Sequence, residues 1–262
     1  MRLARYYTAK LEQMFSLLVT NRASEYLQVV AADKNNIAAM FKDLVATMNV
    51  NAHRAAGELL AAFGPFLDIV GPAEQFLESF GKLGELPPKV KANLLIFAAR
   101  SHFQSGNWKG AQQCALDALT KAPAPSLIRL AALTEAGRYH ALLLSLAESK
   151  GHFTEALEVA KSAASITPPI PAPIAVYFSC LSHIGLSRVF DRVSPTEAID
   201  HIQMAEEHAA RRQFILLPRH QIGEPPRQGL EPATFSLTGS RRINAATFRD
   251  IFRNEKHLRD SR

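Results

Sequence analysis

The sequence predicts an all-α protein, built as a right-handed α-solenoid of antiparallel helix pairs with a partly disordered basic tail after it. Three observations lead to this fold class. Alanine and leucine are abundant while runs of β-branched residues are scarce, which favours helix over strand. Apolar residues recur at three- and four-residue steps over most of the chain. From Pro87 onward, a helix pair with a glycine turn inside it and prolines after it recurs at a near-regular interval.

Residues 1–86 are predicted to form an N-terminal helical region that packs on the array. The polar run Asp33–Asn36 is predicted to be a turn between two helices, and Gly64-Pro65 is predicted to stop another helix. The apolar stripes predict helices over Leu3–Val19, Ser24–Ala32, Ile37–Met48, Ala52–Phe63 and Pro72–Phe80.

Residues 87–213 are predicted to hold about three helix pairs, each with a tight turn inside it. The turns are placed at Ser105–Asn107 in the first pair and at Gly151–Phe153 in the second, and a helix break is expected near Gly137. Prolines such as Pro123 and Pro168 should end the pairs. The predicted helices are Lys89–Phe103, Trp108–Thr120, Ser126–Ser149, Thr154–Ser165, Ala172–Phe190 and Thr196–Arg211.

Small residues stand at fixed places in these pairs, among them Ala98, Ala111 and Ala115 in the first pair and Ala156 and Ala160 in the second. This pattern resembles that of the tetratricopeptide-repeat superfamily. The resemblance implies that two helices cross closely where side chains are small and that the next unit packs into the resulting groove. The sequence departs from the family pattern where His102 and Ala147 replace its tyrosine. The spacing also departs, because Ala111, Ala156 and Ala198 lie 45 and 42 residues apart rather than the usual 34 or so. The matching positions are Leu95, Ala98, Ala99, His102, Ala111, Ala115, Ala118 and Pro123, then Ala156, Ala160, Ala163 and Pro168, then Leu181, Ile184, Gly185, Ala198, Met204 and Ala205.

Long units of this type resemble the repeats in the helical arms of STAND-type regulatory ATPases. The paired tyrosines Tyr6-Tyr7, the polar turn Asp33–Asn36 and the helix Ile37–Met48 resemble the segment that joins such an ATPase to its repeats. This resemblance implies an alternative function, namely a regulatory arm related to, or cut from, such an ATPase.

The positive charge of the chain lies in its last fifth, which we treat as a separate region, 214–262. The net charge is +6, and residues 209–262 hold 11 Lys and Arg against 5 Asp and Glu, so they account for all of it. Prolines and glycines between 218 and 240 predict a linker, and Asn244 could cap a last helix over 244–258. A neutral body with a basic tail favours contact with proteins over binding to nucleic acid.

The sequence predicts no enzyme, no cofactor and no metal site. Gly81-Lys82 is the nearest approach to a phosphate-binding loop, but Phe76 stands where the first glycine belongs. His201, Met204 and His208 share one helix face and could present two imidazoles to a metal, although a packing role is favoured.

Neither the cysteines nor the apolar segments point to secretion or to a membrane. Cys114 and Cys180 suggest no disulfide framework, no secretory leader is evident, and no apolar run is long enough to span a bilayer. We expect the cytoplasm, with the nucleus left open.

The predicted function is an interaction scaffold that binds a peptide or a helix of a partner protein on the concave face, lined by the first helix of each pair. This face lacks the Lys/Asn set with which chaperone-binding repeats grip a terminal carboxylate. Trp108, beside the first turn, could be an exposed anchor for the partner, although burial against the preceding helix as the aromatic of the turn is favoured. The predicted binding residues are Asn93, Ile96, Arg100, Phe103, Arg138, Ser145 and Glu148.

Overall fold

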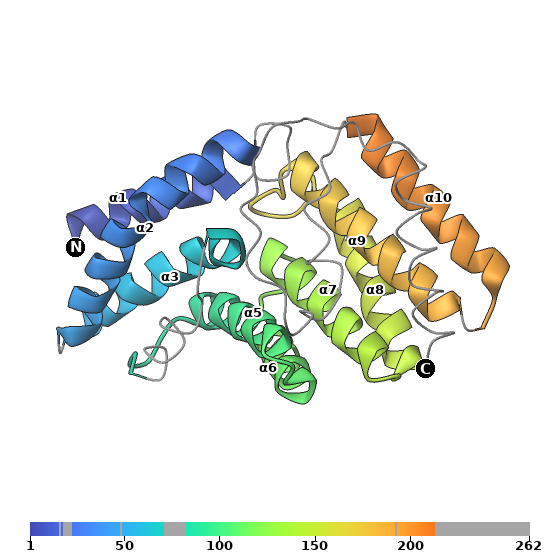
Figure 1. The fold of residues 1–262 in the computed structure, drawn as a ribbon, viewed down its shortest axis with the longest axis horizontal. Coiled ribbons are helices and arrows are strands. Elements are labelled where there is room, and N and C mark those ends of the chain that lie inside the picture. The colour runs from blue at the N-terminus through green and yellow to red at the C-terminus, as the bar shows by residue number, and fades with distance from the viewer. Residues whose placement is uncertain (16, 18–22, 48, 71–81, 192, 213–262) are drawn as a thin grey trace, which may run out of the picture. The chain divides into compact units, whose positions relative to one another are not determined.

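A computed structural model describes residues 1–15, 17, 23–47, 49–70, 82–191 and 193–212 (Figure 1). Every regular element in these residues is an α-helix, so the predicted all-α class is confirmed. None of the helices in these ranges is long and apolar enough to cross a membrane. The predicted helices Pro72–Phe80 and 244–258 and the predicted basic tail lie outside the described residues.

The N-terminal region consists of α1 (Arg2–Phe15), α2 (Ala23–Ala46) and α3 (Val50–Val70), which share one apolar core with Val90, Leu94 and Phe97. The turn predicted at Asp33–Asn36 is wrong, because α2 runs through it without a break. Val30, Ile37 and Phe41 stay buried on one face of α2, which keeps the helical phase across the polar run. Asp33 faces α1 instead, where it accepts a hydrogen bond from Lys10 at 2.7 Å. The N-terminal part of the resemblance to ATPase arms depended on this turn and loses its support.

The stop predicted at Gly64-Pro65 is also wrong, because α3 continues to Val70. A proline inside a helix removes one backbone hydrogen bond and costs about 3 kcal/mol. Phe63 and Phe66, on either side of it, are both fully buried and together contribute a similar amount. Gly64 lets the helix approach Phe97, whose Cβ would lie 3.6 Å from a methyl group placed on this glycine.

The remaining described helices form three consecutive pairs, each packed against the next. The first helices of neighbouring pairs also touch, α5 with α7 and α7 with α9. The bounds of the first and third pairs agree with the predicted ones to within one residue. The pairs are α5 (Pro88–Gln104) with α6 (Trp108–Lys121), α7 (Leu127–Leu142) with α8 (Leu146–Lys161), and α9 (Ala172–Phe190) with α10 (Pro195–Arg212).

The turn of the second pair was predicted at Gly151–Phe153, and the structure places it at Leu143–Ser145 instead. Leu144 has a positive φ of 64°, and the matching residue in the first pair is Gly106 with a φ of 80°. A leucine in this left-handed conformation costs about 1–2 kcal/mol. Because no glycine marks this turn, the sequence pattern missed it. The first two pairs are therefore 38 positions apart, measured from Gly106 to Leu144.

Gly137 and Gly185 do not break helices; they make room for the ring of Phe153 on α8. A methyl group on Gly137 of α7 would lie 3.0 Å from this ring, and one on Gly185 of α9 would lie 2.2 Å from its Cζ. Ser149 also donates a hydrogen bond to the carbonyl oxygen of Gly137 at 2.8 Å. The contacts at Gly137 hold α7 and α8 of the second pair together, and the contact at Gly185 packs the second pair against the third.

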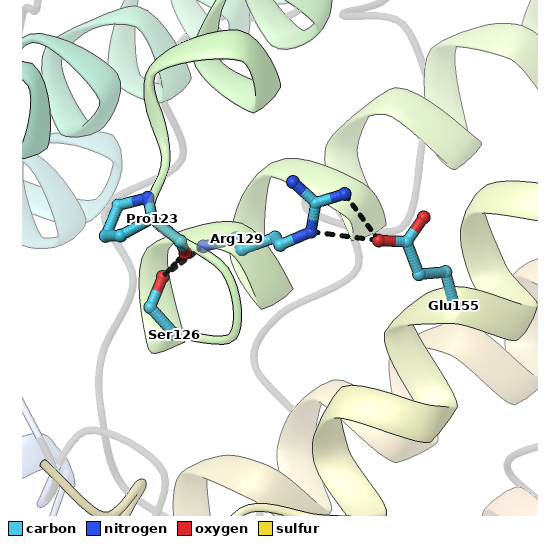
Figure 2. Close-up of polar contacts among 4 residues, drawn as sticks. All are labelled: Pro123, Ser126, Arg129 and Glu155. Atoms are coloured by element: carbon cyan, nitrogen blue, oxygen red, sulfur yellow. Dashed lines mark hydrogen bonds and ion pairs between the residues drawn. The ribbon is translucent and has the colours of Figure 1, made fainter. Parts of the chain in front are cut away.

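The start of α7 is fixed by side-chain hydrogen bonds (Figure 2). The Ser126 hydroxyl donates to the carbonyl oxygen of Pro123 at 2.6 Å and accepts from the backbone N–H of Arg129 at 3.1 Å, which makes it the N-cap. The Arg129 guanidinium reaches across to α8 and donates to Glu155 at 2.6 and 2.9 Å. The helix start is thereby tied to its partner helix.

Candidate functional site

A buried carboxylate lies between two arginines where α5 meets α7. Glu135 of α7 is only 7% exposed. It accepts a hydrogen bond from Nε of Arg100 on α5 at 2.7 Å, and Nη1 of Arg138 lies 3.6 Å from its other oxygen. We call these three residues the Arg–Glu–Arg cluster. Arg138 lies 38 positions after Arg100, so the two arginines occupy equivalent places in the first and second pairs.

The two arginines keep Glu135 ionised in spite of its burial. Burial alone would raise the pKa of Glu135, but the positive charges of Arg100 and Arg138 and the hydrogen bond from Arg100 outweigh it, so the pKa is lowered. One carboxylate between two guanidinium groups leaves a net charge of +1. The cluster therefore presents a fixed positive charge at neutral pH.

Two aromatic rings complete the surroundings of the cluster. The guanidinium carbon of Arg138 lies 4.2 Å from the centre of the Phe103 ring, which is a cation–π contact. The Phe103 ring in turn packs on Tyr139, with 5.7 Å between ring centres. Tyr139 is fully buried, and its burial together with the charge of Glu135 raises the pKa of its hydroxyl well above the usual value. The guanidinium of Arg138 is thus held in place from two sides.

The structure brings together three of the seven predicted binding residues. Arg100, Phe103 and Arg138 meet at the cluster, and all three are half-buried. Asn93 is half-buried near the start of the same helix, α5. Ile96 is 6% exposed and packs in the core among residues such as Ile128, so it is not on the surface.

The prediction required Ser145 and Glu148 to lie on the first helix of the second pair, but neither of them does. Ser145 is in the turn before α8, and Glu148 is exposed in the first turn of α8. The reason is the assumed repeat length. The spacing from Ala111 to Ala156 gives 45 positions between the first and second pairs, whereas the turns lie 38 positions apart, so the second pair was placed seven residues too late. Seven residues are two helical turns, so the predicted helix face was retained while the helix was misplaced.

The sequence pattern missed Glu135 and Tyr139. The available signal was a carboxylate between apolar residues of a helix, at Leu133-Thr134-Glu135-Ala136, three residues before an arginine. A charge flanked in this way is buried only when it is paired. The correct repeat of 38 positions would also have aligned Arg138 with Arg100.

The two histidines considered as metal ligands, His201 and His208, each pack against His183 of the neighbouring helix. His183 of α9 lies between His201 and His208 of α10, with Nδ1 of His183 3.1 Å from Nδ1 of His201 and the rings of His183 and His208 stacked at 5.6 Å. Burial, followed by the neighbouring histidine charges, lowers the pKa of His183 to about 4. No group of three or more metal-binding side chains in the described part of the chain is arranged to hold a metal ion.

Cys180 and Trp108 are two other side chains named from the sequence. Burial raises the pKa of the Cys180 thiol to about 12, so it is not a nucleophile at neutral pH. Trp108 is 39% exposed beside the first turn, so the favoured expectation that it is buried is wrong. No family model, curated protein or solved structure matches the chain.

Proposed function

We propose that this protein is an interaction scaffold: a right-handed solenoid of tetratricopeptide-like helix pairs that binds a peptide or helix of a partner protein on the face formed by α5 and α7. The solenoid arrangement is supported by the succession of packed pairs and by the contacts between the first helices of neighbouring pairs. The 38-position step between equivalent turns is close to the usual repeat length of about 34 residues.

The observation that carries the proposal is the Arg–Glu–Arg cluster. A buried ion pair is a weak device for stability, because removing both charges from water offsets much of their attraction. It is a good device for fixing side chains in one conformation, since Glu135 orients Arg100 by a hydrogen bond at 2.7 Å. Preorganised arginine and aromatic groups are the residue types that contribute most at protein interfaces.

The partner-binding test uses Arg138→Gln, since this change leaves the hydrogen bond between Arg100 and Glu135 in place. Proteins that co-purify with the chain are identified, and the binding of a purified candidate is then measured with each variant. We expect Arg138→Gln to weaken binding by about tenfold or more, because arginine is common among the few interface residues that contribute most of the binding energy. The matched control is Arg54→Gln, an exposed arginine on α3 that pairs with Glu58.

The helical content of each variant is checked by circular dichroism, so that a loss of binding is not a loss of fold. If the partner binds the wild-type chain, Arg138→Gln and Arg54→Gln with equal affinity, the face formed by α5 and α7 is not the binding site. The scaffold function itself would be contradicted if no protein co-purifies with this chain other than those that also co-purify with an unrelated control protein.

A further inference from the structure

The inter-helix turns of the three pairs lie next to one another along one edge. The end of α7 touches the start of α6, where Nε2 of Gln112 lies 3.2 Å from Nδ1 of His140. The start of α8 touches the end of α9, where Nζ of Lys150 lies 4.8 Å from the centre of the Phe190 ring. The pairs can be followed in Figure 1. We call the described residues 105–109, 143–150, 191 and 193–197 together the turn edge.

Each of the three turns presents a large apolar side chain to solvent. Trp108 is 39% exposed at the first turn, Leu144 is 60% exposed at the second and Val193 is 70% exposed at the third. Single exposed apolar residues are ordinary, but one on each successive turn makes a row.

Leu144 is unfavourable here on two counts. Its positive φ would suit glycine, which the first pair has at the equivalent Gly106, and its side chain is exposed to water. A residue that is unfavourable both in its backbone conformation and in its exposure to water points to a contact with another molecule that covers its side chain.

The charged residues along the turn edge change sign from one end to the other. Among the described residues of this edge, Lys109 is exposed at the first turn, whereas Asp191 and Glu197 are exposed at the third. The middle turn carries both signs, with Glu148 and Lys150 exposed in the first part of α8. A surface with this order of charges is complementary to itself when it is turned end to end.

We propose that two copies of this chain pair through the turn edge, about a two-fold axis that passes near Leu144. In this dimer, Leu144 of one copy meets Leu144 of the other, and Trp108 of each copy lies opposite Val193 of its partner. Lys109 of each copy faces Glu197 of its partner. The acidic residues on this edge disfavour an anionic membrane as the occupant. The proposal does not depend on the partner-binding function of α5 and α7.

The experiment measures the mass of the full chain by light scattering and by sedimentation, over concentrations up to about 100 μM, the range in which weak interfaces associate. We expect the wild-type chain to dimerise. Leu144→Gly removes the side chain and relieves the backbone, so it should stay folded while its dimer dissociation constant rises by about tenfold or more. The control is Val50→Ser, which changes a 78% exposed valine on α3 and should leave the dimer unchanged.

A charge exchange tests the orientation of the two copies. Lys109→Glu should weaken the dimer, and combining it with Glu197→Lys should restore the dimer, because the opposite charges again face each other. The proposal is overturned by a wild-type chain that stays monomeric over the whole range. It is equally overturned by a dimer that neither Leu144→Gly nor Lys109→Glu weakens, or by a monomer that binds vesicles containing phosphatidylserine.

Discussion

Replacing Gly185 by alanine tests the packing between the second and third pairs. A methyl group at this position would lie 2.2 Å from Cζ of Phe153 and 2.4 and 2.5 Å from two further ring atoms. Phe153 is 2% exposed, and its ring also contacts Gly137, where a methyl group would lie 3.0 Å from it. A shift of the ring away from Gly185 would therefore bring it into other buried atoms.

The expected magnitude follows from two opposing contributions. Overpacking of a well-filled core costs about 1–3 kcal/mol, and a contact as short as 2.2 Å belongs at the upper end of that range. Replacing glycine by alanine inside a helix contributes about 1 kcal/mol in the stabilising direction. We expect a net loss of about 2 kcal/mol in the free energy of unfolding. For a chain of this size, that corresponds to a fall of about 4–8 °C in the melting temperature.

The assay is thermal and urea unfolding followed by circular dichroism, with a matched glycine as control. Gly151 lies inside α8, and a methyl group added there would have no other atom within 4 Å. Gly151→Ala should therefore stabilise the protein by about 0.5–1 kcal/mol. In the background of Phe153→Leu, which shortens the side chain, Gly185→Ala should cost less than it does alone. The reasoning is refuted if Gly185→Ala is as stable as the wild-type chain, or if its cost is the same in both backgrounds.

Three further predictions concern the cluster, a histidine and a helix cap. Glu135→Gln leaves two arginines beside an uncharged amide and should destabilise the fold by about 3 kcal/mol in urea unfolding, whereas Glu58→Gln in the exposed pair on α3 should cost under about 0.5 kcal/mol. His183 has a folded pKa lowered to about 4, below its unfolded value of about 6.5, so the unfolded chain takes up the proton first. Up to about 3 kcal/mol of stability should therefore be lost as the pH falls from 6.5 towards 4, and unfolding curves of His183→Gln should show a smaller fall; an equal fall would contradict the assignment. Ser126→Ala removes the N-cap of α7 and should lower the free energy of unfolding by about 1 kcal/mol, which a melting temperature equal to that of the wild-type chain would exclude.

The sequence was sufficient for the class and for two of the three helix pairs because their punctuation is standard. Gly106 supplies the positive φ in the first turn, and Pro171 precedes α9 directly. The second turn was missed because Leu144 occupies the left-handed position without the glycine that marks it. Conversely, Gly137 was predicted to break a helix and Gly185 matches the repeat pattern. In the structure, both glycines leave room for the ring of Phe153. Local pattern does not distinguish a glycine needed for conformation from one needed for space.

The candidate site was predicted in part because periodicity places residues on a face but does not pair them. Arg100 and Phe103 were placed together correctly, since both follow one stripe of α5. Arg138 was assigned through a register two helical turns too long, yet it lies at the position equivalent to Arg100. Glu135 was missed because a carboxylate in a helix ordinarily indicates a solvent-exposed face, and only the three-dimensional approach of α5 to α7 shows that it is buried.

Hydrogen exchange of the chain, alone and with a partner identified by co-purification, tests the scaffold function most directly. Exchange of backbone amides is compared peptide by peptide at saturating partner concentration. Binding on the proposed face predicts added protection in the C-terminal halves of α5 and α7, around Arg100 and Arg138, with α1 and α2 unchanged. Protection confined to α1–α3, with α5 and α7 unaffected, would contradict the account.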